Sequence, residues 1–394
     1  MQLPDNRGQL TYCLNIHPTQ TWEEVQAALT GPVRAVKAAV SPDTPFAVGL
    51  RFSAEAAHAL ASFESRAELM ALLDRERYTA ISVNGFPYGP FHGTSVKEQA
   101  YQPDWRSEER LAYTKALADL MASIAPAGEH VSLSTVPGTF KPLSVGAEAD
   151  MAENLLRAVA HCVALKQRTA VSVAIALEPE PFCFLETIAE TIAYFEQYLY
   201  SDIAVQRLAE LSGLSATDAA SALPEHLGVC YDVCHAAVEF EDPVASISAL
   251  RDAGIPVHKL QLSTALRIVE VDAEARAALA AFNESTYLHQ VVACGEHGLA
   301  RYADLPEVLA RGAAGDGEEW RIHFHVPIFA QAFGALGTTQ PFLEEILALH
   351  RREPISAHLE VETYSWNVLP EALRHDKIED AVVRELRWVM ERLA

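Results

Sequence analysis

The sequence predicts an α/β protein of the (β/α)8 TIM-barrel class, formed as one domain over residues 1–394 with helical insertions. Three observations support this prediction. Short β-rich runs alternate with segments of helical periodicity, no glycine-rich phosphate-binding loop follows any run, and polar side chains recur where the later runs end. Strands joined by crossover helices are parallel, and a parallel barrel carries its functional groups at the carboxyl ends of its strands.

Nine runs have the composition of buried strands, which is one more than the barrel requires. We expect that one of the first two lies outside the ring or forms a short extra strand. A doubly wound open sheet is the competing architecture, and the missing glycine-rich loop weakens it. In chain order, the runs cover residues 10–17, 46–52, 79–86, 130–135, 171–180, 227–236, 257–264, 321–327 and 356–364.

The segments between the runs carry apolar residues at helical spacing. Examples are EERLAYTKALADLMASIA (108–125) and MAENLLRAVAHCVALKQ (151–167). Two segments are longer than a crossover helix requires, at about residues 190–225 and 265–320. We interpret the first as inserted helices and the second as an insertion of helices and loops.

The charge balance of the chain excludes some classes of partner. The formal net charge is −23, with 30 Lys and Arg against 53 Asp and Glu, and the basic residues form no cluster in the sequence. Binding to a phosphate backbone requires Lys and Arg that displace counterions. Nucleic acid and anionic membrane surfaces are therefore poor partners, and a metal cation or a neutral polyol fits better.

Other features of the composition predict a cytoplasmic protein without membrane insertion. No apolar run reaches the roughly 18 residues of a membrane-spanning helix. The stretch MQLPDNRGQL lacks the basic and apolar regions of a signal peptide. The six cysteines have no disulfide-framework spacing and mostly lie in apolar runs, which indicates buried thiols.

The run LGVCYDVCHA (227–236) ends in an acid, Asp232, followed three residues later by His235. Burying an unpaired charge costs several kcal/mol, so an acid at the end of a buried strand requires a partner. A divalent cation would neutralise Asp232. The same stretch thus indicates a metal site.

Potential metal ligands end five successive runs. Carboxylate and amide oxygens suit Mg²⁺ or Mn²⁺, and added imidazoles shift the preference towards Mn²⁺ or Zn²⁺. Residues two apart on a strand share a face, so His323 and His325 should point together, as should Glu360 and Glu362. One such residue alone is more often a hydrogen-bonded structural group, but the recurrence favours a metal. The candidate ligands are Glu178, Asp232, His235, Gln261, His323, His325 and Glu360.

The order of these ligands resembles that of the xylose-isomerase-like TIM barrels, which include hydroxypyruvate isomerase, the ketose 3-epimerases and endonuclease IV. The resemblance implies that Glu178, Asp232, Gln261 and Glu360 hold a divalent metal ion, Mn²⁺, Zn²⁺ or Mg²⁺. It also implies that Glu178 and Glu360 act as catalytic acid and base, as two metal-bound glutamates do in the epimerases. His235 would then be a third catalytic residue that orients a substrate hydroxyl.

The resemblance to endonuclease IV is weaker. In that enzyme the histidine matching His235 binds metal, and an Asp-x-His motif stands where this chain has His323-Phe324-His325. Its early histidine ligands are also replaced, since the third run ends in Asn84. These differences favour one metal ion, or two, over a cluster of three.

A second resemblance covers nearly the whole chain. It rests on the blocks YCLNIHPTQTW (12–22), NGFPYGPFHGTSVKEQAYQPDW (84–105), LSTVPGTFKPL (133–143) and HLEVETYSW (358–366). These blocks are similar to the family called metabolite traffic protein EboE. The resemblance implies a place in a metabolite biosynthesis and export pathway, with partners from that pathway.

Five residues near the predicted strand ends are candidates for substrate binding. Asn84 and His92 lie in the NGFPYGPFHG block after the third run, and Lys141 is the cation nearest to the end of the fourth. Trp366 offers an apolar wall to a sugar ring, and His325 is a candidate for both metal and substrate. Lys141 would suit a phosphate or a carboxylate.

Together these features predict metal-dependent isomerisation or epimerisation of a small polyol, sugar or cyclitol. A metal ion that chelates a carbonyl and a neighbouring hydroxyl would acidify the proton on the α-carbon. Two alternatives stay open. One is a non-catalytic, metal-containing metabolite-binding or traffic protein, and the other is an endonuclease IV-like metallohydrolase, which the charge and the replaced ligands disfavour.

Overall fold

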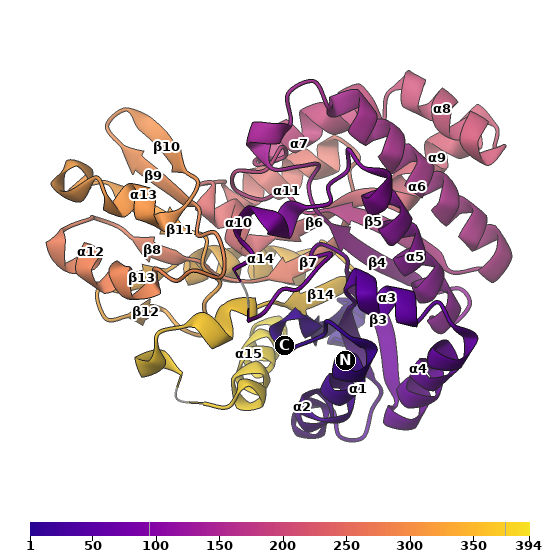
Figure 1. The fold of residues 1–394 in the computed structure, drawn as a ribbon, viewed down its shortest axis with the longest axis horizontal. Helices are drawn as coiled ribbons and strands as arrows, with labels where there is room; N and C mark the ends of the chain where they lie inside the picture. Colours follow the sequence, from indigo (N-terminus) through magenta and orange to yellow (C-terminus); the bar gives the residue numbers. More distant parts are fainter. Residues whose placement is uncertain (94, 375) are drawn as a thin grey trace.

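Eight parallel strands form a nearly closed barrel (Figure 1). The computed structural model describes residues 1–93, 95–374 and 376–394. The strands pair in the order β1-β14-β7-β6-β5-β4-β3-β2, and a parallel bridge between Cys13 and Gly49 joins the two ends of this sheet. The predicted (β/α)8 barrel is confirmed. Its strands are β1 Gln9–Tyr12, β2 Phe46–Arg51, β3 Tyr78–Asn84, β4 His130–Thr135, β5 Ser172–Leu177, β6 Leu227–Asp232, β7 Val257–Leu262 and β14 His358–Val361.

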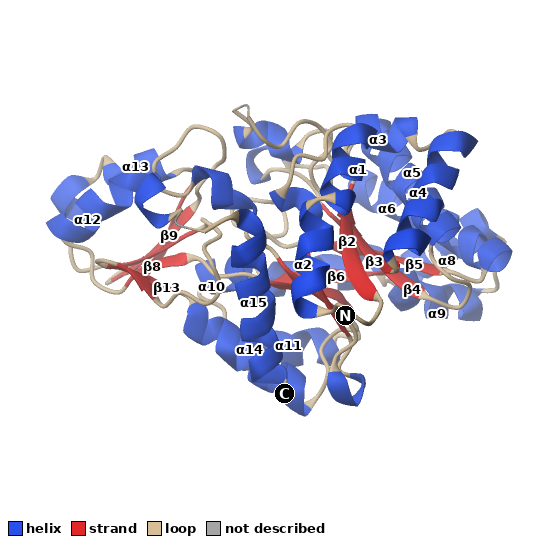
Figure 2. Cartoon of the chain, turned by 90° about the horizontal axis from the view of Figure 1, so that it is seen from below, coloured by secondary structure: helices blue, strands red, loops and turns tan. Residues whose placement is uncertain are grey.

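The helices that connect the strands cover the outside of the barrel (Figures 1 and 2). Several begin at a residue whose side chain accepts a hydrogen bond from the first turn, as Ser107 does for α5. The helices are α1 Trp22–Thr30, α2 Pro32–Val40, α3 Ala54–Ala59, α4 Phe63–Glu76, α5 Glu108–Ile124, α6 Glu148–Thr169, α7 Ile188–Tyr194, α8 Asp202–Ser212, α9 Ala216–His226, α10 Val233–Val238, α11 Pro243–Asp252, α12 Ala273–Leu279, α13 Leu305–Leu309, α14 Gln340–Arg352 and α15 Ile378–Leu393.

A second sheet of six antiparallel strands lies to one side of the barrel (Figures 1 and 2). It is inserted between β7 and β14, and α12 and α13 belong to the same insertion. The order of its strands is β10-β9-β11-β8-β13-β12. They are β8 Leu266–Ile268, β9 Val291–Gly295, β10 Gly298–Tyr302, β11 Glu319–Ile322, β12 Ala332–Phe333 and β13 Leu336–Thr338.

This second sheet corrects two expectations. The ninth strand-like run is not one of the first two, since β1 and β2 are both in the ring. It is the run 321–327, which starts in β11 of the second sheet and leaves it after Ile322. The segment 265–320 contains strands as well as helices and loops. The segment of about 190–225 holds α8 and α9 and parts of its neighbours.

The barrel strands are buried because helices cover their outer face and side chains fill their interior. Strand β6 is buried along its whole length, and β5 is buried from Val173 onwards. Such strands read as nearly continuous apolar runs, which is why the sequence shows them clearly. Within the described residues, no helix combines the length and the apolar composition that crossing a bilayer requires.

The end of β6 explains the acid and the imidazole of LGVCYDVCHA. Asp232 is the last residue of the strand and also caps α10, where its Oδ1 accepts a hydrogen bond from the backbone N–H of His235 at 3.1 Å. The turn from strand to helix therefore brings the two side chains to the same end of the barrel. Both are buried.

Candidate metal centre

Three carboxylates meet around the amide of Gln261 at the carboxyl ends of the barrel strands. Its Nε2 lies 2.9 Å from Glu178 Oε1 and 3.1 Å from Asp232 Oδ2, and it also donates to Glu362 Oε2. An amide nitrogen has two hydrogens, so it cannot satisfy three carboxylate oxygens fully. All four side chains are buried. We call Glu178, Asp232, Gln261 and Glu362 the carboxylate group.

Each member of the carboxylate group comes from the end of a different strand. Glu178 directly follows β5, Asp232 ends β6, Gln261 is the last but one residue of β7, and Glu362 directly follows β14. One oxygen of Glu178, Oε2, is buried without a hydrogen-bond partner among the described residues. This oxygen is free to bind a cation or a proton.

The carboxylates of this group share a strongly negative environment. Burial raises the pKa of Glu178 well above its ordinary value, and Glu362 and Asp232 add to the shift. Burial also raises the pKa of Glu362, against the opposing effect of His325. Burial acts to raise the pKa of Asp232 too, but His235, His325 and the Ser263 hydroxyl together hold it below its ordinary value.

Glu360, expected to be both a ligand and a catalytic residue, does not join this group. Its Oε1 lies 2.7 Å from the ammonium of Lys259, and its other oxygen accepts a hydrogen bond from Ser82. Lys259 stands two residues before Gln261 on β7, just as Glu360 stands two residues before Glu362. The two glutamates do point to the same side of the strand, but only the later one reaches the carboxylate group. Glu362 therefore replaces Glu360 in the site that we propose.

Three imidazoles lie beside the carboxylate group. Nε2 of His235 is 3.0 Å from Nε2 of His323, and Nε2 of His325 is buried without a hydrogen-bond partner among the described residues. The Nε2 atoms of His235 and His325 each lie 4.0 Å from Asp232 Oδ2. We call His235, His323 and His325 the imidazole group.

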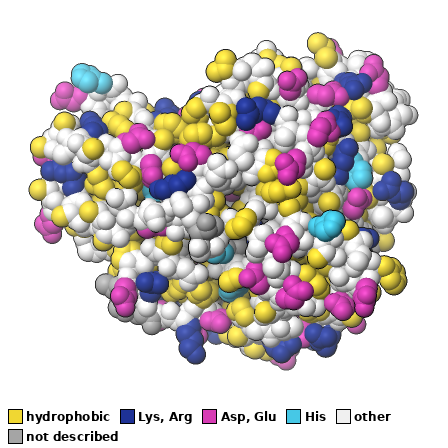
Figure 3. Space-filling model, in the orientation of Figure 1, with side chains coloured by type: hydrophobic (Ala, Val, Ile, Leu, Met, Phe, Trp, Pro, Cys, Tyr) yellow, Lys and Arg dark blue, Asp and Glu magenta, His cyan; other side chains and the backbone are white. Residues whose placement is uncertain are grey.

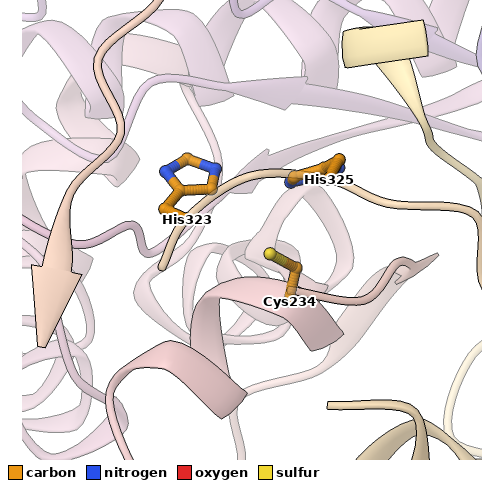
Figure 4. Close-up of side chains that lie close together, drawn as sticks. All are labelled: Cys234, His323 and His325. Carbon is orange, nitrogen blue, oxygen red and sulfur yellow. The ribbon is translucent and has the colours of Figure 1, made fainter. Parts of the chain in front are cut away.

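The imidazole group comes from two parts of the fold. His235 is in α10, whereas His323 and His325 lie on the irregular segment that follows β11 of the second sheet. Figure 4 shows His323 and His325 on this segment, above Cys234 of α10, and these three ligand atoms lie within 4.8 Å of one another. Burial lowers the pKa of His235 to about 4 and that of His323 well below its ordinary value.

A pocket with aromatic walls lies over both groups. The space inside it that can hold the centre of a water molecule is about 60 Å³, and its polar lining includes Glu178, Glu362, His235 and His323. The aromatic part of the lining consists of Phe86, Phe91, Tyr101, Tyr287 and Tyr364.

The structure brings one of the other predicted residues directly to the site. Asn84, at the end of β3, donates from Nδ2 to Glu362 Oε1 at 3.1 Å and lines the pocket. His92 lies behind the pocket, where its ring bonds the Asn15 carbonyl at 2.5 Å and the Tyr287 hydroxyl at 3.0 Å.

The structure places two predicted substrate-binding residues outside the pocket lining. Lys141 pairs with Glu186 at 2.6 Å and with Glu190 at 2.9 Å. Trp366 is buried in a short 3-10 helix, Tyr364–Val368, and Tyr364 lines the pocket in its place. The ion pairs of Lys141 and the burial of Trp366 give no support to the substrate-binding roles expected for these two residues.

Several residues of the site escaped the sequence analysis. Asn15 donates to Glu362 Oε1 at 2.6 Å, although its position after a short first strand gave no sign of this. Glu180 accepts from the Tyr101 hydroxyl at 2.7 Å, and burial raises its pKa to about 8. Gln290 bonds both Tyr101 and His323. Of these residues, only Glu180 could have been found from the sequence, because it is the second acid of the LEPE stretch that ends the fifth run.

Comparison with known proteins adds the following findings. No protein-family model and no curated protein matches the chain. Among solved structures, the IolI protein with a bound zinc atom is 9% identical, with 98% of each chain covered and a TM-score of 0.46. The 3-keto-D-glucoside 4-epimerase YcjR of E. coli is 12% identical, with 99% of each chain covered and a TM-score of 0.44.

A third similar structure is a putative sugar phosphate isomerase/epimerase of Anabaena variabilis, which is 11% identical, with 98% of each chain covered and a TM-score of 0.49. Structures described as xylose isomerase domain proteins are similar as well. At these identities the likenesses concern the fold alone. The chain itself shows the barrel, through its eight parallel strands.

Proposed function

We propose that this protein is a divalent-metal-dependent isomerase or epimerase of a sugar or cyclitol. The observation that carries the proposal is the convergence of three carboxylates and one amide from four strand ends beneath an aromatic-lined pocket. Aromatic walls suit the C–H faces of a polyol ring, and the polar residues of the lining suit its hydroxyls.

The carboxylate group fits a hard divalent cation, Mn²⁺, Zn²⁺ or Mg²⁺. Its donors are carboxylate and amide oxygens, the ligands that such ions take, and Glu178 Oε2 has no other described partner. Lys259, the buried cation nearby, is already paired with Glu360. When bound, the ion would polarise a substrate carbonyl and lower the pKa of the neighbouring C–H.

Glu178 and Glu362 are the proposed acid and base. Asn15 and Asn84 both donate to Glu362 Oε1, and hydrogen bonds of this kind favour the ionised form, so Glu362 is suited to take a proton from carbon. Glu178 accepts a hydrogen bond only from Gln261 among the described residues, so one of its oxygens can bind the ion while the other holds the proton that is returned. One carboxylate removes a proton next to the carbonyl and the other delivers one.

Two further parts of the proposal rest on the sequence. The resemblance to the EboE family supports a role in a metabolite pathway of the cytoplasm, with partners from that pathway. The face shown in Figure 3 carries Lys and Arg scattered among acidic residues, without a basic cluster, and this supports the view that nucleic acid is not a partner.

The test is exchange of substrate hydrogen with solvent. Purified protein loaded with Mn²⁺ should incorporate deuterium from D₂O next to the carbonyl of a ketose or a keto-cyclitol in a panel of such compounds. Glu178→Gln and Glu362→Gln should each abolish the exchange. Glu353→Gln is the matched control, because that side chain is exposed and pairs only with Arg251 among the described residues. Metal binding without exchange for any compound would instead support the non-catalytic binding protein.

A further inference from the structure

The inner end of the pocket carries an excess of negative charge. Glu178, Asp232 and Glu362 meet there, and Glu180 joins the lining. When ionised around a metal, the first three carboxylates carry one negative charge more than a single divalent ion neutralises. An anionic group on a substrate would therefore be repelled from this pocket unless a cation of the protein received it.

Lys97 is the one candidate for such a cation. Among the described residues that line the pocket, it is the only Lys or Arg. Its ammonium lies 2.6 Å from Oδ2 of Asp304, in the insertion that holds the second sheet. The backbone N–H of Lys97 donates to the carbonyl oxygen of Thr286, in the same insertion, at 3.0 Å. The charge of Lys97 is thus already neutralised by an acid that lies outside the carboxylate group.

Asp304 is held in place without the help of Lys97. Its Oδ1 accepts hydrogen bonds from the backbone N–H groups of Leu305 and His289, both at 3.0 Å. The first of these bonds caps α13. The other oxygen is therefore fixed in position to pair with Lys97, and an anionic substrate would have to displace an acid that is anchored to the backbone.

The other cations that adjoin the pocket wall are engaged as well. Arg51 of β2 and Arg110 of α5 are buried, and each donates at 2.6 Å to a backbone carbonyl oxygen of the segment that follows β3. Lys141 and Lys259 are paired with glutamates. The described part of the chain therefore offers a phosphate or a carboxylate no unpaired partner at this site.

We propose that Asp304 is a specificity-determining residue, which keeps Lys97 neutralised and so restricts the pocket to sugars or cyclitols without a phosphate or carboxylate group. Specificity of this kind comes from leaving the rejected ligand without a charge partner. The inference rests on the proposed function for the polyol itself and narrows its substrate class.

The first test uses inorganic phosphate, so it does not require a known substrate. Protein loaded with Mg²⁺ is titrated at pH 8, where free imidazoles are neutral, and binding is followed by the ³¹P line width. Asp304→Asn keeps the cap of α13 but leaves Lys97 without an anionic partner. This variant should bind phosphate about 10-fold more tightly than the wild type, as expected for one additional charge-assisted hydrogen bond. The bound metal contributes equally to both proteins.

Two further variants assign this gain to Lys97. The double variant Lys97→Met, Asp304→Asn should lose it. Asp316→Asn is the matched control, because it releases Arg276 of the same insertion, which does not line the pocket. It should bind phosphate like the wild type. Unchanged phosphate binding in Asp304→Asn would overturn the proposal, as would an equal gain in Asp316→Asn or a gain that persists in the double variant.

A second measurement needs only the wild type and covers the case in which a variant fails to fold. Calorimetry on Mn²⁺-loaded protein compares D-fructose with D-fructose 6-phosphate, and a keto-inositol with its phosphate ester. The neutral compounds should bind at least about 100-fold more tightly than their esters, since binding of an ester brings like charges together. An ester that binds as tightly as its parent would overturn the inference. Binding of the neutral compounds without deuterium exchange would reject the proposed function alone.

Discussion

At the scale of residues, Glu360 and Glu362 show how two neighbouring acids acquire different tasks. Glu360 neutralises Lys259 inside the barrel, and both side chains are almost completely buried, at 1% and 0% exposure. Glu362 lines the pocket and accepts from two asparagine amides. We infer that the first acid serves stability and that the second serves the metal.

This difference predicts that replacing each glutamate by glutamine affects a different property: metal affinity for Glu362 and stability for Glu360. Glu362→Gln should weaken Mn²⁺ binding by more than the roughly 10- to 100-fold that the loss of an outer-shell partner costs. It should not destabilise the metal-free protein, because it replaces one of three crowded carboxyl groups by a neutral amide. Glu360→Gln should lower the free energy of unfolding by about 3 kcal/mol, because it leaves the Lys259 ammonium uncompensated.

Calorimetric titration and urea unfolding of the two variants measure both effects. Loss of metal affinity in Glu360→Gln at unchanged stability would restore the original assignment from the sequence. It would also show that the buried ion pair with Lys259 opens when metal binds.

The sequence could predict much of this site because its ligands end recognisable strands. Glu178, Asp232 and Gln261 were found in this way, and all three contribute to the carboxylate group. The sequence could not decide between Glu360 and Glu362 as the ligand, because the two residues are two apart and both point into the barrel. Only their partners on β7 distinguish them, since Glu360 pairs with Lys259 and Glu362 accepts from Gln261. Gln290 was invisible, because its contact with His323 depends on a sheet that the sequence did not reveal.

At the scale of elements, the second sheet explains why the strand count failed. The strands of the second sheet are short. The apolar run 321–327 begins in β11 and continues past the end of this strand at Ile322, so in the sequence it has the length and composition of a barrel strand. The barrel strands could be predicted because they are buried on both faces and read as continuous apolar runs. Antiparallel strands of two to five residues carry a much weaker signal.

Strand β2 illustrates how closely the barrel elements approach one another. A Cβ on Gly49 would lie 2.2 Å from Glu360 Oε2 and 3.0 Å from the carbonyl oxygen of Tyr12. Gly49 also makes the bridge to Cys13 that joins the ends of the sheet. The glycine thus leaves room for the Lys259–Glu360 pair at the point where the barrel closes.

We predict that Gly49→Ala lowers the free energy of unfolding by about 1–3 kcal/mol, the usual cost of overpacking. The matched control is Gly89→Ala, where an added Cβ meets nothing within 4 Å and the change should stay within about 0.5 kcal/mol. Urea unfolding of both variants measures the difference. Equal stability of the two would mean that Glu360 can move aside without cost.

At the scale of the whole molecule, the barrel has buried histidines at both ends. The imidazole group lies at the carboxyl ends of the strands. At the other end, the buried His358 and the half-buried His130 begin β14 and β4, and the buried His258 is the second residue of β7. The ring of His130 lies 5.1 Å from that of His258 and 5.4 Å from that of His358, between centroids. These three rings lie at the amino ends of their strands, opposite the end that carries the carboxylate group, so we expect their titration to affect stability.

Burial, reinforced by His130, lowers the pKa of His258 to about 3 and that of His358 to about 3. Between about pH 6.5 and 3, such a ring is protonated in the unfolded chain but stays neutral in the folded protein. The unfolded state then holds more protons, so stability rises with pH across this window and is lost as the solution is acidified. The buried acids oppose this trend, since burial raises the pKa of Glu180 to about 8 and that of Glu385 to about 7.

The contribution of one ring is therefore best measured as a difference between two proteins. His358→Asn keeps a group that can bond the Ser132 hydroxyl, now 2.9 Å from Nδ1, but removes the titration. On lowering the pH from 7 to 4.5, the wild type should lose up to about 2.5 kcal/mol more stability than this variant. His297→Asn, on an exposed histidine, should follow the wild type. Urea unfolding of the metal-free proteins at both pH values measures these changes, and parallel losses in wild type and His358→Asn would show that His358 is protonated in the folded protein.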